Sequence, residues 1–287
     1  MIPFPQSGNI TQWLHWGAHE LENTLEDSSQ ESEWLLSSLL NCKRSELFGF
    51  DESFTNDQAA IFKQWIHRRK KGEPAQYISG WTEFYGRRFN VSPSVLIPRQ
   101  ETERVMDVAL HTLQEIESPS IVDIGTGSGC IAVSIAAELK NSFVTGIDIS
   151  AEALAVAEEN AALNNIKNIE FLQLNFLDQI PHETKYDALV MNPPYIPQVE
   201  MDSMMEEVKH HEPESSLTDH SDGLTFYKHL AKVAKYWVRS NGWLIMEVGR
   251  GEHPQKAKAC YKNDIFSQHE LITDLNSDDR ILKVRVT

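Results

Sequence analysis

The chain has 287 residues, a length that fits about two domains. Lys and Arg total 26 against 42 Asp and Glu, and the resulting net charge of −16 disfavours nucleic acid phosphates unless one face is basic. The three cysteines form no CxxC pair, which argues against a disulfide framework or a cysteine zinc cluster. No signal-peptide pattern and no run of about 18 apolar residues occurs, so we expect a cytoplasmic protein without membrane contact.

The N-terminal part of the chain is predicted to be helical. Apolar residues recur at spacings of four and three residues from Leu14 to Leu25, and similar patterns follow. We therefore expect a helical domain over residues 1–79. Residues 80–98 are rich in aromatic and β-branched side chains and carry a turn signal at Gly86, which predicts a β-hairpin linker.

Predicted strands and helices alternate after this linker. The segments SIVDIG, SFVTGID, IEFLQL and YDALVM are predicted to be strands. A helical stretch lies between the first and second of them, and another lies between the second and third. This order predicts a doubly wound α/β fold with a mostly parallel sheet covered on both faces. FSQHELITDL and RILKVRV flank the turn signal NSDD and predict a terminal antiparallel pair. We assign residues 99–287 to this domain.

A glycine-rich loop joins the first of these strands to a helix. Glycines let the backbone turn sharply and approach a ligand, and the helix N-terminus offers free N–H groups. Cys130 stands where a dinucleotide fingerprint has Gly or Ala, and the chain has no GxxxxGK[ST] motif. The loop is therefore a predicted cofactor site that consists of Gly125, Thr126, Gly127, Ser128 and Gly129.

An acidic residue follows the second predicted strand. Asp148 lies 23 residues after Gly125, where a carboxylate can accept hydrogen bonds from the hydroxyls of a ribose. Both NAD and S-adenosyl-L-methionine (SAM) contain such a ribose. The structural alternative is a strand-to-helix turn in which Asp148 or Ser150 only caps the next helix.

The fourth predicted strand ends in the turn Asn192-Pro193-Pro194-Tyr195. Two prolines fix φ and lack N–H groups, so the turn is rigid and leaves carbonyl oxygens without local partners. The Asn192 side-chain oxygen and the Pro193 carbonyl can accept both hydrogens of a planar –NH2 group while Tyr195 stacks on it. With a SAM methyl group held in line, this arrangement predicts methyl transfer to an amide or amine nitrogen by Asn192, Pro193 and Tyr195 without a metal. The alternative is a proline turn that only ends the strand.

Together, the glycine loop, Asp148 and the Asn-Pro-Pro-Tyr turn resemble class I SAM-dependent methyltransferases that act on amino nitrogens. Further motifs are Gly72-Glu73-Pro74, Glu83-Phe84-Tyr85-Gly86, Ile97-Pro98-Arg99, Glu101-Thr102-Glu103, His211-Glu212-Pro213 and Asp222-Gly223-Leu224. These motifs make the chain similar to the release factor glutamine methyltransferase family. The substrate of that family is the glutamine in the Gly-Gly-Gln loop of class 1 peptide-chain release factors.

This resemblance implies a helical domain that docks the release factor, a hairpin linker and a catalytic domain. It implies that residues 125–129 and Asn192 line the SAM site, that Asp148 holds the ribose, and that residues 192–195 bind the glutamine. S-adenosyl-L-homocysteine is then the product. The family commonly has an acidic residue and an aromatic residue beside the adenine, where this chain has Asn175 and Phe176. The Asn175 oxygen can still accept a hydrogen bond from the adenine amino group.

Two other functions remain open at this point. A nucleic acid amino-methyltransferase would use the same turn on a flipped DNA adenine or rRNA guanine, but the negative charge and the lack of a basic recognition domain disfavour it. A catalytically silent SAM-binding scaffold would not need the intact Asn192, Pro193 and Tyr195. The Ile97-Pro98-Arg99 and Glu101-Thr102-Glu103 segments fit equally well near the mouth of the active site and as a rigid linker.

Two groups of residues receive no functional role. Arg68-Arg69-Lys70-Lys71 ends a predicted helix, where cations complement the helix dipole, and we expect a solvated turn. The pairs His15/His19 and His210/His211 lack the further ligands that a metal site needs, so no metal is predicted.

Overall fold

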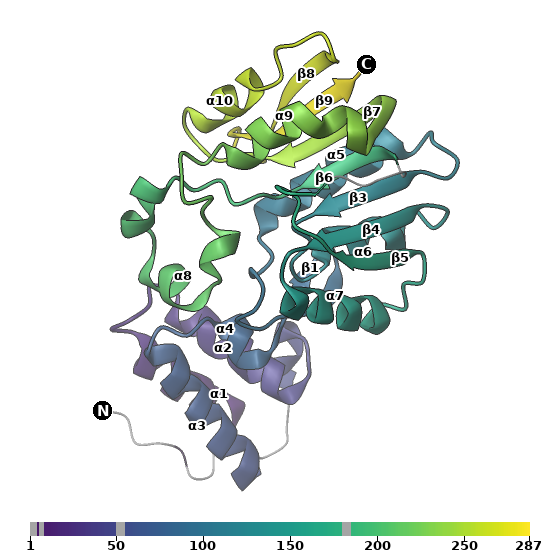
Figure 1. Ribbon diagram of the computed structural model, residues 1–287. Helices are drawn as coiled ribbons and strands as arrows, with labels where there is room; N and C mark the ends of the chain where they lie inside the picture. The colour runs from purple at the N-terminus through teal and green to yellow at the C-terminus, as the bar shows by residue number, and fades with distance from the viewer. Residues whose placement is uncertain (1–4, 6–8, 50–54, 180–184) are drawn as a thin grey trace. The chain divides into compact units, whose positions relative to one another are not determined.

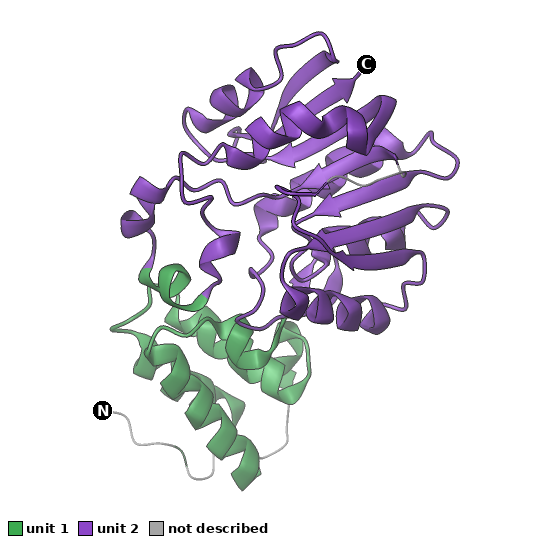
Figure 2. Cartoon of the chain, viewed as in Figure 1, with its two compact units in different colours: residues 1–81, 206–211 green, residues 82–205, 212–287 purple. Residues whose placement is uncertain are grey.

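The computed structural model describes residues 5, 9–49, 55–179 and 185–287 (Figure 1). The chain forms two compact units (Figure 2). Residues 1–81 and 206–211 make up the first unit, and residues 82–205 and 212–287 make up the second. None of the described helices is long and apolar enough to cross a membrane.

The first unit is helical, as the apolar spacing predicts. Its elements are α1 (Ile10–Leu21), α2 (Ser28–Leu40), the 3-10 helix η1 (Arg44–Gly49), α3 (Asn56–Lys70), α4 (Ala75–Ser79) and α8 (Glu206–His211). The side chains of Asn9 and Thr55 cap α1 and α3 in capping boxes with Gln12 and Gln58. The helices enclose a core that includes Trp13, Leu21, Leu35, Phe62 and Ile66. Packing therefore accounts for the apolar stripe of this region.

Arg69 corrects the expectation of a solvated basic turn at the end of α3. Its side chain is only 4% exposed, and its guanidinium contacts Glu31 and Glu207, each at 2.8 Å. An arginine is rarely buried unless carboxylates pair with it, and both partners lie far from it in the sequence. Through Glu207, Arg69 holds α8 within the helical unit, although our sequence boundaries place residues 206–211 in the α/β domain.

A β-hairpin follows the helical segment, in agreement with the sequence pattern. The strands β1 (Trp81–Phe84) and β2 (Arg87–Asn90) form a two-stranded sheet. Tyr85 and Gly86 connect them with φ angles of 50° and 69°. Positive φ at both central residues is the geometry of the two-residue turn that best matches the twist of a hairpin.

The second unit is built on a mostly parallel sheet, as predicted. Within the described residues, the strands in spatial order are β5 (Ile169–Gln173), β4 (Phe143–Asp148), β3 (Ser120–Ile124), β6 (Tyr186–Met191), β7 (Val238–Glu247), β9 (Asp279–Val286) and β8 (Phe266–Thr273). The first five are parallel, whereas β9 runs antiparallel to both β7 and β8. The strand order reverses between β3 and β6, and such a switch point is where open α/β sheets bind ligands.

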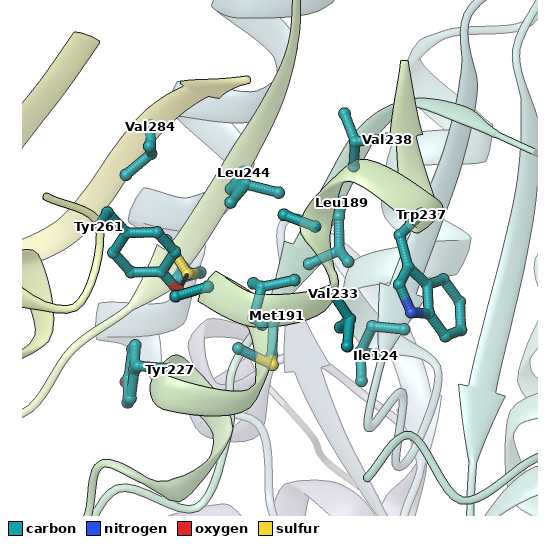
Figure 3. Packing of buried hydrophobic residues seen from close by; sticks show 14 of the residues in the cluster. Ile124, Leu189, Met191, Tyr227, Val233, Trp237, Val238, Leu244, Tyr261 and Val284 are labelled. Carbon is teal, nitrogen blue, oxygen red and sulfur yellow. Dashed lines mark hydrogen bonds between the residues drawn. The ribbon is translucent and has the colours of Figure 1, made fainter. Parts of the chain in front are cut away.

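Helices cover both faces of this sheet. One face packs against α5 (Glu103–Leu113), α6 (Cys130–Glu138) and α7 (Ala151–Leu163). The other packs against α9 (Thr225–Trp237) and α10 (His253–Ala259), where Trp237, Tyr227 and Tyr261 meet strand residues such as Leu189 and Leu244 (Figure 3). The two buried clusters alternate along each central strand, as expected of strands covered on both sides. Short 3-10 helices η2 (Gln100–Thr102), η3 (Gln198–Ser203) and η4 (Glu214–Ser216) complete the unit.

Candidate active site

The register of the sheet brings the predicted site residues to one level. One row of paired positions crosses the four central strands at Ile147, Ile124, Met191 and Met246. The residues that follow this row, in the same order, are Asp148, Gly125, Asn192 and Glu247. Neighbouring strands lie about 4.8 Å apart, so the glycine loop and the Asn-Pro-Pro-Tyr turn begin side by side at the carboxyl edge of the sheet. The switch point therefore assembles the two motifs that the sequence separates.

The glycine loop has the open backbone that its sequence predicts. Gly125, Gly127 and Gly129 have φ angles of 69°, 55° and 78°, which residues with a Cβ atom adopt only with strain. The N–H groups of Gly125 and Thr126 donate to the Ile147 carbonyl at 2.8 and 2.9 Å, which fixes the loop to β4. A Cβ added at Gly125 would meet no atom within 4 Å. The loop thus exposes bare backbone that a ligand can approach.

The far end of the loop is fixed by two close contacts. A Cβ at Gly129 would lie 3.0 Å from the Ala157 Cβ, so this glycine permits the close packing of α6 against α7. The buried Asn160 amide donates to the Ser128 carbonyl at 2.8 Å and to the Asn90 carbonyl at 3.0 Å. A buried polar group that makes these bonds specifies the conformation of the loop.

Asp148 lies where the sequence analysis expects a ribose acceptor. Its Oδ2 accepts from the Gly127 N–H at 2.9 Å, and its Oδ1 accepts from the Ser150 N–H at 3.0 Å. Ser150 caps α7 through the Ala153 N–H, so the structural role considered as an alternative is present. Each carboxylate oxygen of Asp148 retains a second lone pair that can accept a hydroxyl. Binding of a ribose stays a prediction.

Asp123 is a buried acid directly before the glycine loop. Burial raises the pKa of Asp123 to about 7, although the Thr126 hydroxyl donates to it at 2.7 Å and opposes the shift. Its environment therefore favours the protonated form far more than water does.

The Asn-Pro-Pro-Tyr turn presents two acceptors that no described residue uses. Pro193 is buried and Asn192 is half-buried at the end of β6. The Asn192 Nδ2 group donates to the Thr102 hydroxyl at 3.2 Å, which leaves its Oδ1 atom for another donor. Among the described residues, no N–H or O–H group donates to Asn192 Oδ1 or to the Pro193 carbonyl. The two proline rings supply the rigidity that the sequence predicts.

Glu247 and Thr102 also lie in this candidate site. From the sequence, the Glu101-Thr102-Glu103 segment fits both the mouth of the site and a rigid linker, and Glu247 is not assigned. Glu247 is only 1% exposed; its carboxylate accepts from the Thr102 hydroxyl at 2.7 Å and from the Tyr195 hydroxyl at 3.0 Å. Burial raises the pKa of Glu247, and the two hydroxyl hydrogen bonds oppose this shift. A charged residue at the end of the apolar segment of β7 is the signal that would have found it.

A glycine lies directly against the backbone of Tyr195, and a histidine contacts that glycine. A Cβ at Gly223 would lie 2.3 Å from the Tyr195 carbonyl oxygen, so only glycine fits there. His253 accepts from the Gly249 N–H at 3.0 Å, and its Nε2 atom faces the Gly223 carbonyl at 3.0 Å. Because Nδ1 accepts, Nε2 carries the hydrogen, and burial lowers the pKa of this ring. The Asp222-Gly223-Leu224 motif therefore supports the turn.

Two of the sequence motifs meet through an ion pair. Buried Glu212 accepts from the Ile97 N–H at 3.2 Å and pairs with the Arg99 guanidinium. This contact joins the segment before α5 to the His211-Glu212-Pro213 motif, 113 positions later. Arg99 thus helps to fix the segment that carries Thr102.

Asn175 and Phe176 have structural partners of their own. The Asn175 side chain accepts from the Leu177 N–H at 3.1 Å and donates to Asp178 at 2.5 Å. Phe176 is 4% exposed and packs against Phe226, His229 and Trp237 of α9. These contacts explain both residues without a ligand, so their contact with adenine stays a prediction.

Known protein families match most of the chain. Residues 12–80 match the PrmC N-terminal domain, and residues 99–215 match the Methyltransferase small domain. A release factor glutamine methyltransferase of Geobacter sulfurreducens is 34% identical over 288 residues, covering 100% of both chains. The enzyme of the same name from Fusobacterium nucleatum is 38% identical, covering 88% of this chain and 72% of its own. That of Bacillus subtilis is 35% identical, covering 95% of this chain and 96% of its own.

A solved structure has a similar fold. A methyltransferase from Pyrococcus furiosus aligns with a TM-score of 0.52 and 17% identity, covering 81% of this chain and 98% of its own. This likeness supports the α/β fold that the strand order describes.

The raised pKa of Asp123 predicts a pH-dependent stability. Between about pH 4 and 7 the unfolded chain is ionised at this position while the folded protein keeps its proton, so this group lowers stability as pH rises. Asp123→Asn removes this dependence. The free energy of unfolding of the variant, relative to that of the wild type, should therefore rise by about 2–3 kcal/mol when the pH is raised from 5 to 8. Urea unfolding at both pH values measures it, with exposed Glu159→Gln as the control. An equal difference in stability at both pH values would contradict the assignment.

Proposed function

The chain belongs to the release factor glutamine methyltransferase family, and we propose that it methylates a glutamine side chain in class 1 peptide-chain release factors. The methyl group comes from SAM, and the acceptor is the amide nitrogen (N5) of the glutamine in the Gly-Gly-Gln loop. S-adenosyl-L-homocysteine is the second product. Release factors act on ribosomes, so we place this activity in the cytoplasm.

The observation that carries this proposal is the pair of unused acceptors at the Asn-Pro-Pro-Tyr turn. Asn192 Oδ1 and the Pro193 carbonyl accept no hydrogen bond from the described residues. A primary amide nitrogen has two hydrogens in one plane and can donate one to each acceptor. The Tyr195 ring, held by Glu247 through its hydroxyl, is proposed to stack on the same group. Residues 192–195 therefore form the proposed substrate site.

The residues at the start of α6 fit SAM. The open space above Gly125 admits a ligand against the backbone, and Asp148 keeps lone pairs for two ribose hydroxyls. The loop residues Thr126, Gly127, Ser128 and Gly129 complete the proposed cofactor site, with Asn192 at its border. Asn175 and Phe176 are proposed to lie beside the adenine.

The chemistry requires positioning and charge stabilisation. When bound, SAM supplies a methyl group on a positively charged sulfur, which needs no metal to activate it. In the proposed transfer, the glutamine nitrogen would form the new C–N bond as the S–C bond breaks, sulfur would keep the electron pair, and solvent water would take the proton that leaves the nitrogen. Asn192 and Pro193 hold the nitrogen in line and stabilise the positive charge that develops on its N–H groups.

The helical unit is the proposed docking surface for the release factor. An open pocket of about 530 Å³ within this unit is lined by Trp16, Glu20, Ala60, Lys63, Gln64, Ile66, His67 and Lys70. The pocket offers both apolar and polar side chains to a protein partner, and one of its lysines, Lys70, pairs with Glu20 at 2.8 Å. The net charge of −16 disfavours a nucleic acid substrate.

Transfer of labelled methyl groups from SAM tests the proposed function. The acceptors are unmethylated release factor, a variant with the glutamine of its Gly-Gly-Gln loop replaced, total tRNA and DNA. We expect label in the release factor that disappears when the loop glutamine is replaced. Label in nucleic acid alone would show an amino-methyltransferase of another substrate class, and no label in any acceptor would favour a silent SAM-binding protein.

Alanine substitutions at two glycines with the same φ distinguish an effect on cofactor binding from an effect of backbone strain. Gly125 and Gly86 both have φ of 69°, and a Cβ at either would meet nothing within 4 Å. Gly125→Ala and Gly86→Ala should each cost about 1 kcal/mol of stability because of the left-handed backbone. Only Gly125→Ala should weaken SAM binding, by about tenfold or more, because its methyl group enters the proposed site.

Calorimetric titration with SAM and thermal unfolding measure the two effects for each variant. Equal SAM affinity in the two variants would remove Gly125 from the cofactor site.

A further inference from the structure

We propose that Glu247, acting through Thr102, holds the Asn192 side-chain amide in the one orientation that presents its oxygen to the substrate amide. This inference rests on the proposed function and assigns two positioning residues to it. Glu247, Thr102 and Asn192 form a continuous hydrogen-bond chain from the end of β7 to the end of β6.

The geometry of this chain is compact and buried. Glu247 Oε2 lies 2.7 Å from Thr102 Oγ1, which lies 3.2 Å from Asn192 Nδ2. Both Glu247 and Thr102 are almost fully buried, so water does not compete for these groups. The second carboxylate oxygen, Oε1, lies 3.0 Å from the Tyr195 hydroxyl. One buried acid thus contacts Tyr195 directly and Asn192 through Thr102, at the two ends of the Asn-Pro-Pro-Tyr turn.

When Glu247 is ionised, counting hydrogens fixes the direction of every bond in the chain. An ionised carboxylate has no hydrogen, so both hydroxyls must donate to Glu247. The single hydroxyl hydrogen of Thr102 is then committed, and Thr102 can only accept from Asn192. The NH2 end of the Asn192 amide must therefore face Thr102, and its oxygen must face the other way. Without this constraint the two orientations of an amide differ little in shape.

The orientation decides which chemical group the turn can hold. An oxygen at the open end of Asn192, together with the Pro193 carbonyl, offers two acceptors to the two hydrogens of a glutamine amide nitrogen. The opposite orientation would place an NH2 group against that nitrogen and would instead attract the amide oxygen. A glutamate side chain has only acceptors when ionised, so the same orientation rejects it. Glu247 and Thr102 thereby select the nitrogen that is methylated.

The first test compares two substitutions of Thr102. Thr102→Val keeps the shape of the side chain but removes the hydroxyl, whereas Thr102→Ser keeps the hydroxyl. We expect Thr102→Val to lower kcat/KM for the release factor by about 10- to 100-fold, with SAM affinity within about twofold of the wild type. Thr102→Ser should recover most of that loss. A Thr102→Val enzyme with wild-type kcat/KM would overturn the inference.

The second test reverses the direction of the chain. In Asn192→Asp, two carboxylates compete for the one Thr102 hydrogen, and we expect at least about a 1,000-fold loss of kcat/KM. Adding Glu247→Gln supplies an NH2 group that donates to Thr102 and frees the Thr102 hydrogen for the carboxylate introduced at position 192. The double variant Asn192→Asp/Glu247→Gln should then be at least about tenfold more active than Asn192→Asp alone. A double variant no better than the single variant would contradict the chain.

Wild-type activity separates failure of this inference from failure of the proposed function. If the wild type transfers no methyl group to the release factor, the proposed function is wrong. If the wild type is active and neither test shows the expected change, only the role of Glu247 and Thr102 is wrong. Thermal unfolding and calorimetric SAM binding of each variant show that the compared proteins are folded.

Discussion

A single row of paired strand positions at the carboxyl edge of the sheet brings Asp148, Gly125, Asn192 and Glu247 to one level. Parallel strands end at the same edge, and the reversal of strand order between β3 and β6 leaves room there for the glycine loop and the proline-rich turn. The two motifs that are proposed to bind the cofactor and the substrate amide therefore meet because of strand register. Hydrogen bonds from side chains then set the orientation of each group within that frame.

The site combines rigid backbone with buried acids. The backbone angles of the glycine loop and of the two prolines are favoured by the residue types themselves. Burying carboxyl groups is costly unless they are hydrogen-bonded, and burial raises the pKa of both Asp123 and Glu247. Hydroxyl donors offset part of that cost, Thr126 for Asp123 and Thr102 with Tyr195 for Glu247. In return these acids order the two loops, an arrangement typical of functional sites.

Sequence patterns predicted the elements and motifs well because these depend on neighbouring residues. The helical segment, the hairpin, the parallel sheet and the antiparallel pair follow from periodicity and turn residues, and the structure confirms them. The long-range contacts could not be predicted in this way. Thr102 and Glu247 are 145 positions apart, and Arg69 is buried by partners on two distant helices, although its sequence context suggests a solvated turn. Likewise, the core packing of Phe176 is visible only after α9 is placed beside it.

One site is proposed to hold both the methyl donor and a glutamine amide whose nitrogen faces Asn192 Oδ1. A crystal structure with S-adenosyl-L-homocysteine and a Gly-Gly-Gln peptide tests it most directly. We predict the homocysteine sulfur beside the glycine loop and the glutamine nitrogen about 2.9 Å from both Asn192 Oδ1 and the Pro193 carbonyl. A glutamine whose carbonyl oxygen faces Asn192, or a ligand bound away from residues 125–129, would show that the site does not bind these groups as proposed.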